Sequence, residues 1–470
     1  MKLKQVLNNT FFNILISVSK AILDLLFVKY CILNLGNDQY SDWVLIISII
    51  SFVKLLDFGT NQSLILLFIK KNFKKINETI TFKIIVSLVV SIIFFFFVFY
   101  FFDYFQIVHF KRGKGIMLIM LLSHLLFINI GGPLTSYLLS KEEFIKVIIT
   151  SGLYVLLPLA LFLIIGFKDL FFFAILNFVC LIIVLVLQYY WSNFKNYIPN
   201  FKFSFKIFFY VFNNSNKIFF LFNLAVIFYP AVEILFIKYY LGNDTLVNHV
   251  IYFKLPLLFV AFMSQLMTNY FPAIAIKTNE NIEEAHTYIN NLFYNLLKLC
   301  FISSLVIFCF NNLFISLWMS DQYSLGYNSL IIIQLLTFVD ALIWSVQQMV
   351  LPHNPKLFKI KFFIYELVFR FSIIFVLRYY SLLDYNLFIL TCLISKLFLF
   401  IGLFNSYHFI NKKFKFYHIK YLIFCLIFLY LFTYFFFNNK ILLNTIYSSI
   451  LFISSITLLL INRKKIKNLF

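Results

Sequence analysis

The chain has 470 residues, of which 63% are hydrophobic and only 12% are charged, whereas an ordinary soluble domain carries roughly 25% charged residues. This composition excludes a soluble globular protein, because too few polar residues remain to cover a surface in water. The formal net charge of +21 would suit nucleic acid. The basic residues lie in short loops rather than in one patch, so no nucleic-acid partner is expected.

Long apolar runs alternate with short polar segments along the chain, and each run has about the length that crosses roughly 30 Å of hydrocarbon as a helix. The runs are apolar on every side, which favours helices over barrel strands. We therefore expect an all-α polytopic membrane protein with about 14 transmembrane helices. The expected spans are 8–34, 42–67, 83–102, 116–139, 147–167, 169–190, 214–240, 246–270, 288–310, 327–350, 360–378, 386–408, 421–437 and 441–461.

The first span carries a polar stripe. Asn9, Asn13, Ser17, Lys20 and Asp24 recur every three or four residues, so they share one face of a helix. A charge at mid-bilayer costs about 2.5–3.5 kcal/mol on insertion scales. The stripe is therefore expected to face protein or water.

Later spans also place polar residues near their centres or toward their outer ends. In chain order these are Lys54, Asp57 and Asn61 in span two, Glu233 and Lys254 in spans seven and eight, Asn291, Asn295 and Lys298 in span nine, Asp340 in span ten, Glu366 and Arg370 in span eleven, and Lys396 in span twelve. Together they predict a hydrated cavity lined with both signs of charge. The alternative is that neighbouring opposite charges only neutralise each other so that the helices can insert. Such pairs would be Lys20 with Asp24, Lys54 with Asp57, and Glu366 with Arg370.

Other intramembrane features have a structural explanation. Lys29 and Lys238 lie near outer span ends, where lysines can extend their heads to the membrane surface. His124 is expected to be a hydrogen-bonded packing residue. Gly131-Gly132-Pro133 and Pro256 are expected to bend their helices.

The basic residues also predict the orientation of the chain. Most lysines lie at the N-terminus and in alternate loops, and Lys83 is counted with them at the inner end of span three. The opposite loops hold only Lys111, Arg112, Lys114, Lys168, Arg378 and Lys440. By the positive-inside rule both termini are expected to be cytoplasmic.

The longest cytoplasmic linker divides the chain, and a short repeat supports the division. The expected parts are an N-terminal six-helix lobe (1–195), the linker (196–213), a C-terminal six-helix lobe (214–410), and two additional helices with a basic tail (411–470). Leu35-Gly36-Asn37-Asp38 ends span one, and Leu241-Gly242-Asn243-Asp244 ends span seven on the same side. Corresponding turns at corresponding span ends favour duplicated halves.

Several common enzyme motifs are absent from the sequence. Gly113-Lys114-Gly115 lacks the frame of a nucleotide-binding P-loop, and neither a zinc-protease helix nor a nucleophile elbow is present. The six cysteines are scattered without a C-x-x-C pair, so neither a metal site nor a disulfide framework is indicated. We expect no catalytic residues and no cofactor.

The chain resembles the polysaccharide-export branch of the multidrug/oligosaccharidyl-lipid/polysaccharide (MOP) flippase superfamily, which includes O-antigen flippases. The resemblance covers most of the chain through the order and spacing of several short patterns. These are the Asn-rich first helix, Leu35-Gly36 before Tyr40, Leu56-Asp57-Phe58-Gly59, Phe271-Pro272, and Leu317-Trp318-Met319.

This resemblance implies a two-lobed flippase in a bacterial inner membrane. Its substrate would be an undecaprenyl-pyrophosphate-linked oligosaccharide, a repeat unit of surface polysaccharide such as O-antigen in lipopolysaccharide. Its partners would be membrane lipids, and a polysaccharide polymerase and a chain-length regulator could act beside it. Candidate substrate-binding residues are Lys20, Lys54, Lys298, Arg370, Lys396, Asn13 and Asn295, and candidate ion-coupling residues are Asp24, Asp57, Asp340, Glu233 and Glu366. A related multidrug exporter and a membrane polysaccharide polymerase or ligase remain as alternatives.

Overall fold

The chain is helical throughout the part that the structure describes. This computed structural model describes residues 3–57, 60–69, 73–101, 113–141, 143–166, 169–192, 224, 230–263, 267, 274, 281–320, 323, 326–353 and 360–410. Within these ranges no residue forms a strand, and seven helices, or eight if one bent pair is a single span, are long and apolar enough to cross a membrane. The all-α polytopic expectation is confirmed. The two additional helices expected after residue 410 lie outside the described residues.

The chain divides into two compact units, Met1–Val247 and Asn248–Phe470. The first unit contains a helix at residues 230–241 and the elements α1 (Leu3–Ser51), η1 (Phe52–Asp57), α2 (Thr60–Ile69), α3 (Phe73–Phe101), α4 (Gly113–Leu126), η2 (Phe127–Gly131), α5 (Gly132–Ser140), α6 (Phe144–Ile165) and α7 (Leu170–Ser192). The boundary between the units falls inside α10 (Asn243–Tyr252). The predicted linker, 196–213, lies outside the described residues, so that division stays a prediction.

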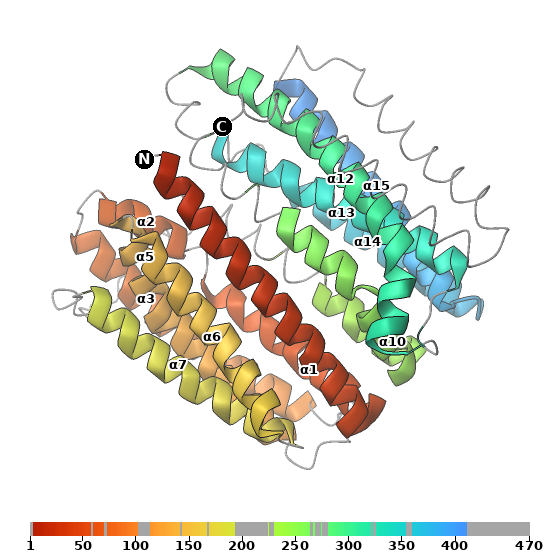
Figure 1. The fold of residues 1–470 in the computed structure, drawn as a ribbon, viewed down its shortest axis with the longest axis horizontal. Helices are drawn as coiled ribbons and strands as arrows, with labels where there is room; N and C mark the ends of the chain where they lie inside the picture. The colour runs from red at the N-terminus through yellow and green to blue at the C-terminus, as the bar shows by residue number, and fades with distance from the viewer. Residues whose placement is uncertain are drawn as a thin grey trace. The chain divides into compact units, whose positions relative to one another are not determined.

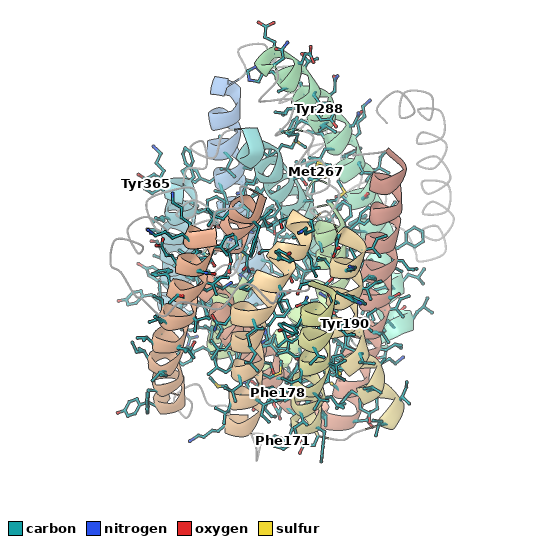
Figure 2. All side chains as sticks on the ribbon, turned by 90° about the vertical axis from the view of Figure 1, so that its left-hand side faces the viewer. Phe171, Phe178, Tyr190, Met267, Tyr288 and Tyr365 are labelled. Carbon is teal, nitrogen blue, oxygen red and sulfur yellow. The ribbon has the colours of Figure 1, made fainter. Side chains whose placement is uncertain are left out.

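Aromatic packing holds the core of the first unit. The helix α6 packs against α1 and α7, and α2 packs against α3 and α5 (Figure 1). Phe27, Trp43, Phe162 and Phe173 are all buried, and the ring centroids of Phe27 and Phe173 are 4.8 Å apart. Many apolar and aromatic side chains point outward instead, among them Tyr190 (Figure 2). This outward apolar surface is what a bundle surrounded by lipid requires.

The second unit is built around one central helix. α13 (Tyr327–His353) is the most buried of the described spans and packs between α12 (Ile282–Trp318) and α15 (Tyr385–Ile410), while α14 (Ile360–Tyr379) packs on α15. Asn281 caps α12, because its side chain accepts a hydrogen bond from the Glu283 backbone N–H at 2.9 Å. With 37 residues, α12 is about 55 Å long. It is therefore longer than the hydrocarbon core of a bilayer.

Several helices are interrupted where the sequence indicates it. Gly36 has φ 83° and breaks α1, and a π-helical turn, η2, precedes Gly132 and Pro133. α10 and Lys254–Met263 meet at an angle of 46°, beside Pro256. The predicted bend near Pro256 is confirmed, whereas at Gly131-Gly132-Pro133 the structure shows a π-helical turn within one span. Span three was predicted to begin at residue 83, but α3 begins ten residues earlier.

Candidate functional site

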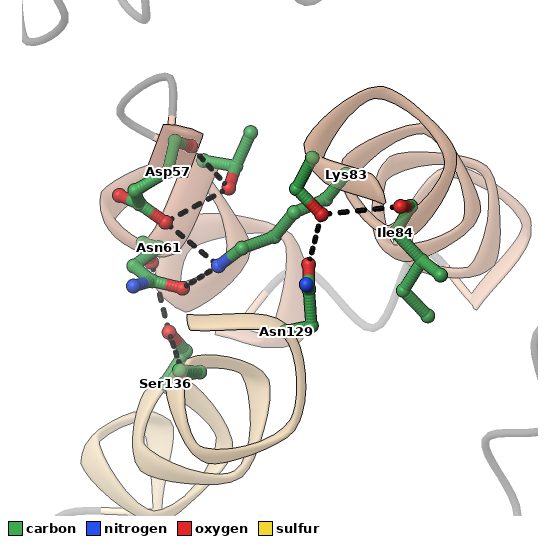
Figure 3. Close-up of polar contacts among 9 residues, drawn as sticks. Asp57, Asn61, Lys83, Ile84, Asn129 and Ser136 are labelled. Atoms are coloured by element: carbon green, nitrogen blue, oxygen red, sulfur yellow. Dashed lines mark hydrogen bonds and ion pairs between the residues drawn. The ribbon is translucent and has the colours of Figure 1, made fainter. Parts of the chain in front are cut away.

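A buried polar cluster lies at the centre of the first unit. Lys83 is fully buried, and its Nζ is 2.7 Å from Asp57 Oδ1 and 2.7 Å from Asn61 Oδ1 (Figure 3). Thr60 Oγ1 donates to the backbone oxygen of Asp57 at 2.7 Å and lies 3.2 Å from its Oδ1. Burying a charge is favourable only when it is paired and hydrogen-bonded. The ammonium group of Lys83 therefore joins α3 to η1 and α2.

The π-helical turn closes one side of this cluster. Ser87 Oγ, one turn after Lys83, donates to Asn129 Oδ1 at 2.6 Å (Figure 3). Ser136 Oγ lies 3.0 Å from the backbone oxygen of Asn61. A Cβ atom on Gly132 would lie only 2.6 Å from Asn61 Oδ1. A glycine at this position lets the backbone approach the Asn61 amide closely.

Lys83 is the residue that sequence reasoning missed. It was counted at the cytoplasmic end of the predicted span three, but α3 begins ten residues before it, and the Lys83 side chain is fully buried in the first unit. In the alternative of neutralising pairs, the Asp57 carboxylate would pair with Lys54; in the structure it pairs with Lys83. The side chain of Lys54 lies outside the described part. A recognisable signal existed, since Thr79, Lys83, Ser87 and Ser91 follow at intervals of four residues and are all buried.

The second unit holds a buried ion pair that the sequence did predict. Arg370 Nε donates to Glu366 Oε1 at 2.9 Å, and both side chains are buried. Ser395 Oγ on α15 donates to the same oxygen at 2.6 Å. The other carboxylate oxygen, Glu366 Oε2, is buried with no hydrogen-bond partner in the described structure. The pair thus stabilises the contact of α14 with α15.

A second ion pair links α13 to α15. Lys396 Nζ bonds to Asp340 Oδ1, and both side chains are largely buried. The two residues were predicted separately, and the structure brings them together. Roles for Arg370 and Lys396 in substrate binding, and for Glu366, Asp340 and Asp57 in ion coupling, stay predictions.

The first unit contains another ion pair near the turn at Gly242. Lys238 Nζ bonds to Asp42 Oδ1, and the Asp42 carboxylate is fully buried. The expectation that Lys238 extends its head to the membrane surface is therefore wrong. Asp42, the first residue of the predicted span two, was not among the candidate residues.

Two predicted basic residues are exposed at mid-helix positions. Lys298 shares one face of α12 with Asn291 and Asn295, and all three side chains are exposed. Lys20 on α1 is exposed too, whereas Asp24, one turn later, is half-buried. The side chain of Asn13 lies outside the described part of α1.

Two further candidates, Glu233 and Lys254, are half-buried. Lys254 is the first residue after the bend that follows α10. Across the described ranges, no group of three or more His, Cys, Asp or Glu side chains is placed to hold a metal ion.

Several solved structures have a similar fold. No family model and no curated protein sequence matches the chain. The lipid II flippase MurJ in an inward closed conformation is similar with a TM-score of 0.67 and 13% identity, over 98% of this chain and 100% of that one. An inward-facing multidrug resistance MATE family transporter of the MOP superfamily has a TM-score of 0.62 and 12% identity, over 86% and 98%.

The Vibrio cholerae MATE transporter VcmN is also similar, with a TM-score of 0.60 and 10% identity, over 86% of this chain and 96% of that one. At these identities the likeness concerns the fold. The chain has the fold shared by the MATE transporters of the MOP superfamily and the lipid II flippase MurJ.

Proposed function

We propose that the protein is a flippase that moves an undecaprenyl-pyrophosphate-linked oligosaccharide from the cytoplasmic to the periplasmic leaflet of a bacterial inner membrane by alternating access. Both termini are cytoplasmic in this proposal. Its fold is that of a protein named as a lipid II flippase. The observation that carries the proposal is the exposed stripe of Asn291, Asn295 and Lys298 on α12.

The stripe suits an anionic head group. Lipid cannot solvate an ammonium group in the span Glu283–Phe308, so Lys298 needs a hydrated or protein-lined space. Pyrophosphate oxygens form charge-assisted hydrogen bonds with lysine, and the amides of Asn291 and Asn295 can bond to sugar hydroxyl groups. In the proposal Lys20 adds a second basic contact from α1.

The balance of accessible charge favours this substrate over cationic drugs. Asp57, Asp340 and Glu366 already have basic partners within their own units. The side chains of Lys20 and Lys298 are exposed. A multidrug exporter for cationic compounds would need accessible acids instead. The paired acids remain our proposed sites for a coupling proton or sodium ion, together with Asp24 and Glu233.

Flipping by the purified protein in lipid vesicles tests the proposal. The substrate is a fluorescent undecaprenyl-pyrophosphate oligosaccharide, and the readout is the fraction that becomes accessible in the opposite leaflet. Lys298→Ala is expected to slow flipping by about tenfold, as for the loss of one charged hydrogen bond. Lys141→Ala removes an exposed lysine just after α5 and serves as the matched control.

Two results would contradict the proposal. The first is that the unaltered protein moves no lipid-linked oligosaccharide while it transports a cationic drug. The second is that Lys298→Ala and Lys141→Ala behave alike, which would remove the basic stripe from substrate binding.

A further inference from the structure

The two copies of Leu-Gly-Asn-Asp lie against each other in the first unit. Gly36 has φ 83° and Gly242 has φ 92°. This is a backbone region that glycine enters easily and other residues rarely adopt. Each glycine thus makes a turn that presents the following Asn and Asp side chains.

The side chains of the two turns bond reciprocally. Asn37 Nδ2 donates to Asp244 Oδ1 at 3.0 Å, and Asn243 Nδ2 donates to Asp38 Oδ1 at 2.8 Å. Each copy supplies one donor and one acceptor, which is the pattern of two equivalent elements related by a twofold axis. We call these four residues the outer clasp.

A buried ion pair accompanies the outer clasp. Ser41 Oγ donates to Asn243 Oδ1 at 3.0 Å, and the next residue, Asp42, bonds to Lys238. The clasp bonds are exposed, so water can replace them when they break. The Asp42 carboxylate is fully buried, and its separation from Lys238 requires that water enter. The exposed clasp bonds and the buried Asp42–Lys238 pair therefore hold the same helix ends, and the buried pair is the harder of the two to break.

The outer clasp also reaches the second unit through the chain itself. Asn243 and Asp244 begin α10, which continues past Val247 into the second unit. Any restraint on the start of α10 therefore acts on the first helix of that unit. In the predicted topology both turns lie on the periplasmic side.

We propose that the outer clasp and the Asp42–Lys238 pair form a latch that closes the periplasmic end and must open for each substrate release. The inference rests on the proposed flippase function, because alternating access requires that one end close while the other opens. The duplication gives the latch two equivalent bonds. Each bond joins an Asn to an Asp, so a substitution at one of these two residues can be compensated by a substitution at the other.

Distances between spin labels test the latch without any transport assay. Labels at Leu33→Cys and Tyr239→Cys use exposed positions just before the two turns. The full chain is measured in lipid nanodiscs. Cys31, Cys180, Cys300 and Cys392 are buried and are kept, while Cys309 and Cys425 are replaced by alanine.

Asn37→Asp places a carboxylate opposite that of Asp244. The repulsion should raise the population of long distances between the two spin labels about fivefold, the equivalent of roughly 1 kcal/mol. Adding Asp244→Asn restores one Asn–Asp bond in the reverse direction and should return the distances to those of the parent. Unchanged distances in all three proteins would overturn the latch. Failure of the second substitution to restore them would overturn the pairing.

A disulfide tests the functional step. Asp38→Cys with Asn243→Cys is expected to form a crosslink on oxidation, to abolish flipping in vesicles, and to regain flipping on reduction. Each single variant should be insensitive to oxidant. Full crosslinking with normal flipping would overturn the latch, as would the absence of a crosslink. If the reduced parent flips no substrate, the proposed function fails, and the distance measurement still decides whether the latch exists.

Discussion

The two units bury comparable acids in different ways. In the first unit, Lys83 reaches Asp57 from another helix, 26 residues along the chain, and also binds Asn61. In the second unit, Arg370 binds Glu366 from the same helix, four residues away. Residues four apart on a helix are neighbours whatever the rest of the fold does. The Asp57–Lys83 pair, in contrast, exists only because α3 packs beside η1 and α2.

The comparison shows what each pair stabilises. Removing the Asp57–Lys83 pair takes away a polar link from α3 to both η1 and α2. In the second unit Ser395 Oγ bonds directly to Glu366 Oε1, so the link from α15 to α14 does not depend on Arg370 alone. We therefore expect the first pair to matter more for stability than the second.

The largest effect is expected from Lys83→Met. Among the described side chains it leaves the Thr60 hydroxyl group as the polar neighbour of the buried Asp57 carboxylate, and it should lower the free energy of unfolding by about 3–5 kcal/mol. Reversible unfolding of the purified protein in mixed micelles measures this value. Adding Asp57→Asn removes the buried charge and should recover most of the loss. If the double variant is no more stable than Lys83→Met, charge burial is not the cause.

A smaller effect is expected from Arg370→Met. The Glu366 carboxylate keeps its bond from Ser395, so the loss should be about 3 kcal/mol, at the lower end for a broken buried pair. The same unfolding experiment compares it with Lys83→Met, and Glu366→Gln added to Arg370→Met is the matched control. A loss larger than that of Lys83→Met would reverse the comparison.

The smallest effect is expected from Gly132→Ala. The added methyl group would lie 2.6 Å from Asn61 Oδ1 and should displace this amide from Lys83, at a cost of about 1–2 kcal/mol. Gly326→Ala is the control, since nothing lies within 4 Å of its added Cβ. Equal stability of the two variants would mean that the Asn61 amide contributes little to holding Lys83.

Hydropathy located most described spans well and failed where a helix carries charges. The predicted span 169–190 matches α7, Leu170–Ser192, because its apolar residues must lie in lipid. Span three was predicted to begin at residue 83, after Lys74, Lys75 and Glu78. The helix α3 contains all three, because a helix can continue beyond the hydrocarbon region into polar surroundings.

Some pairings among the candidate residues could be predicted from helical periodicity, and others depend on how the helices pack. Glu366 with Arg370 and the stripe of Asn291, Asn295 and Lys298 were predictable, since helical periodicity alone places them together. Lys396 and Asp340 were recognised as costly intramembrane charges, but their pairing depends on how α13 packs against α15.

The sequence by itself determined that this protein is a bundle of membrane helices, because the lipid excludes every unpaired backbone group and leaves helices as the way to bury such apolar runs. It also determined the turns at Gly36 and Gly242. Only the tertiary structure decided that Lys83 neutralises Asp57 and that Asn37 bonds to Asp244. These partners lie on different helices, and their meeting depends on helix packing, which no local pattern specifies.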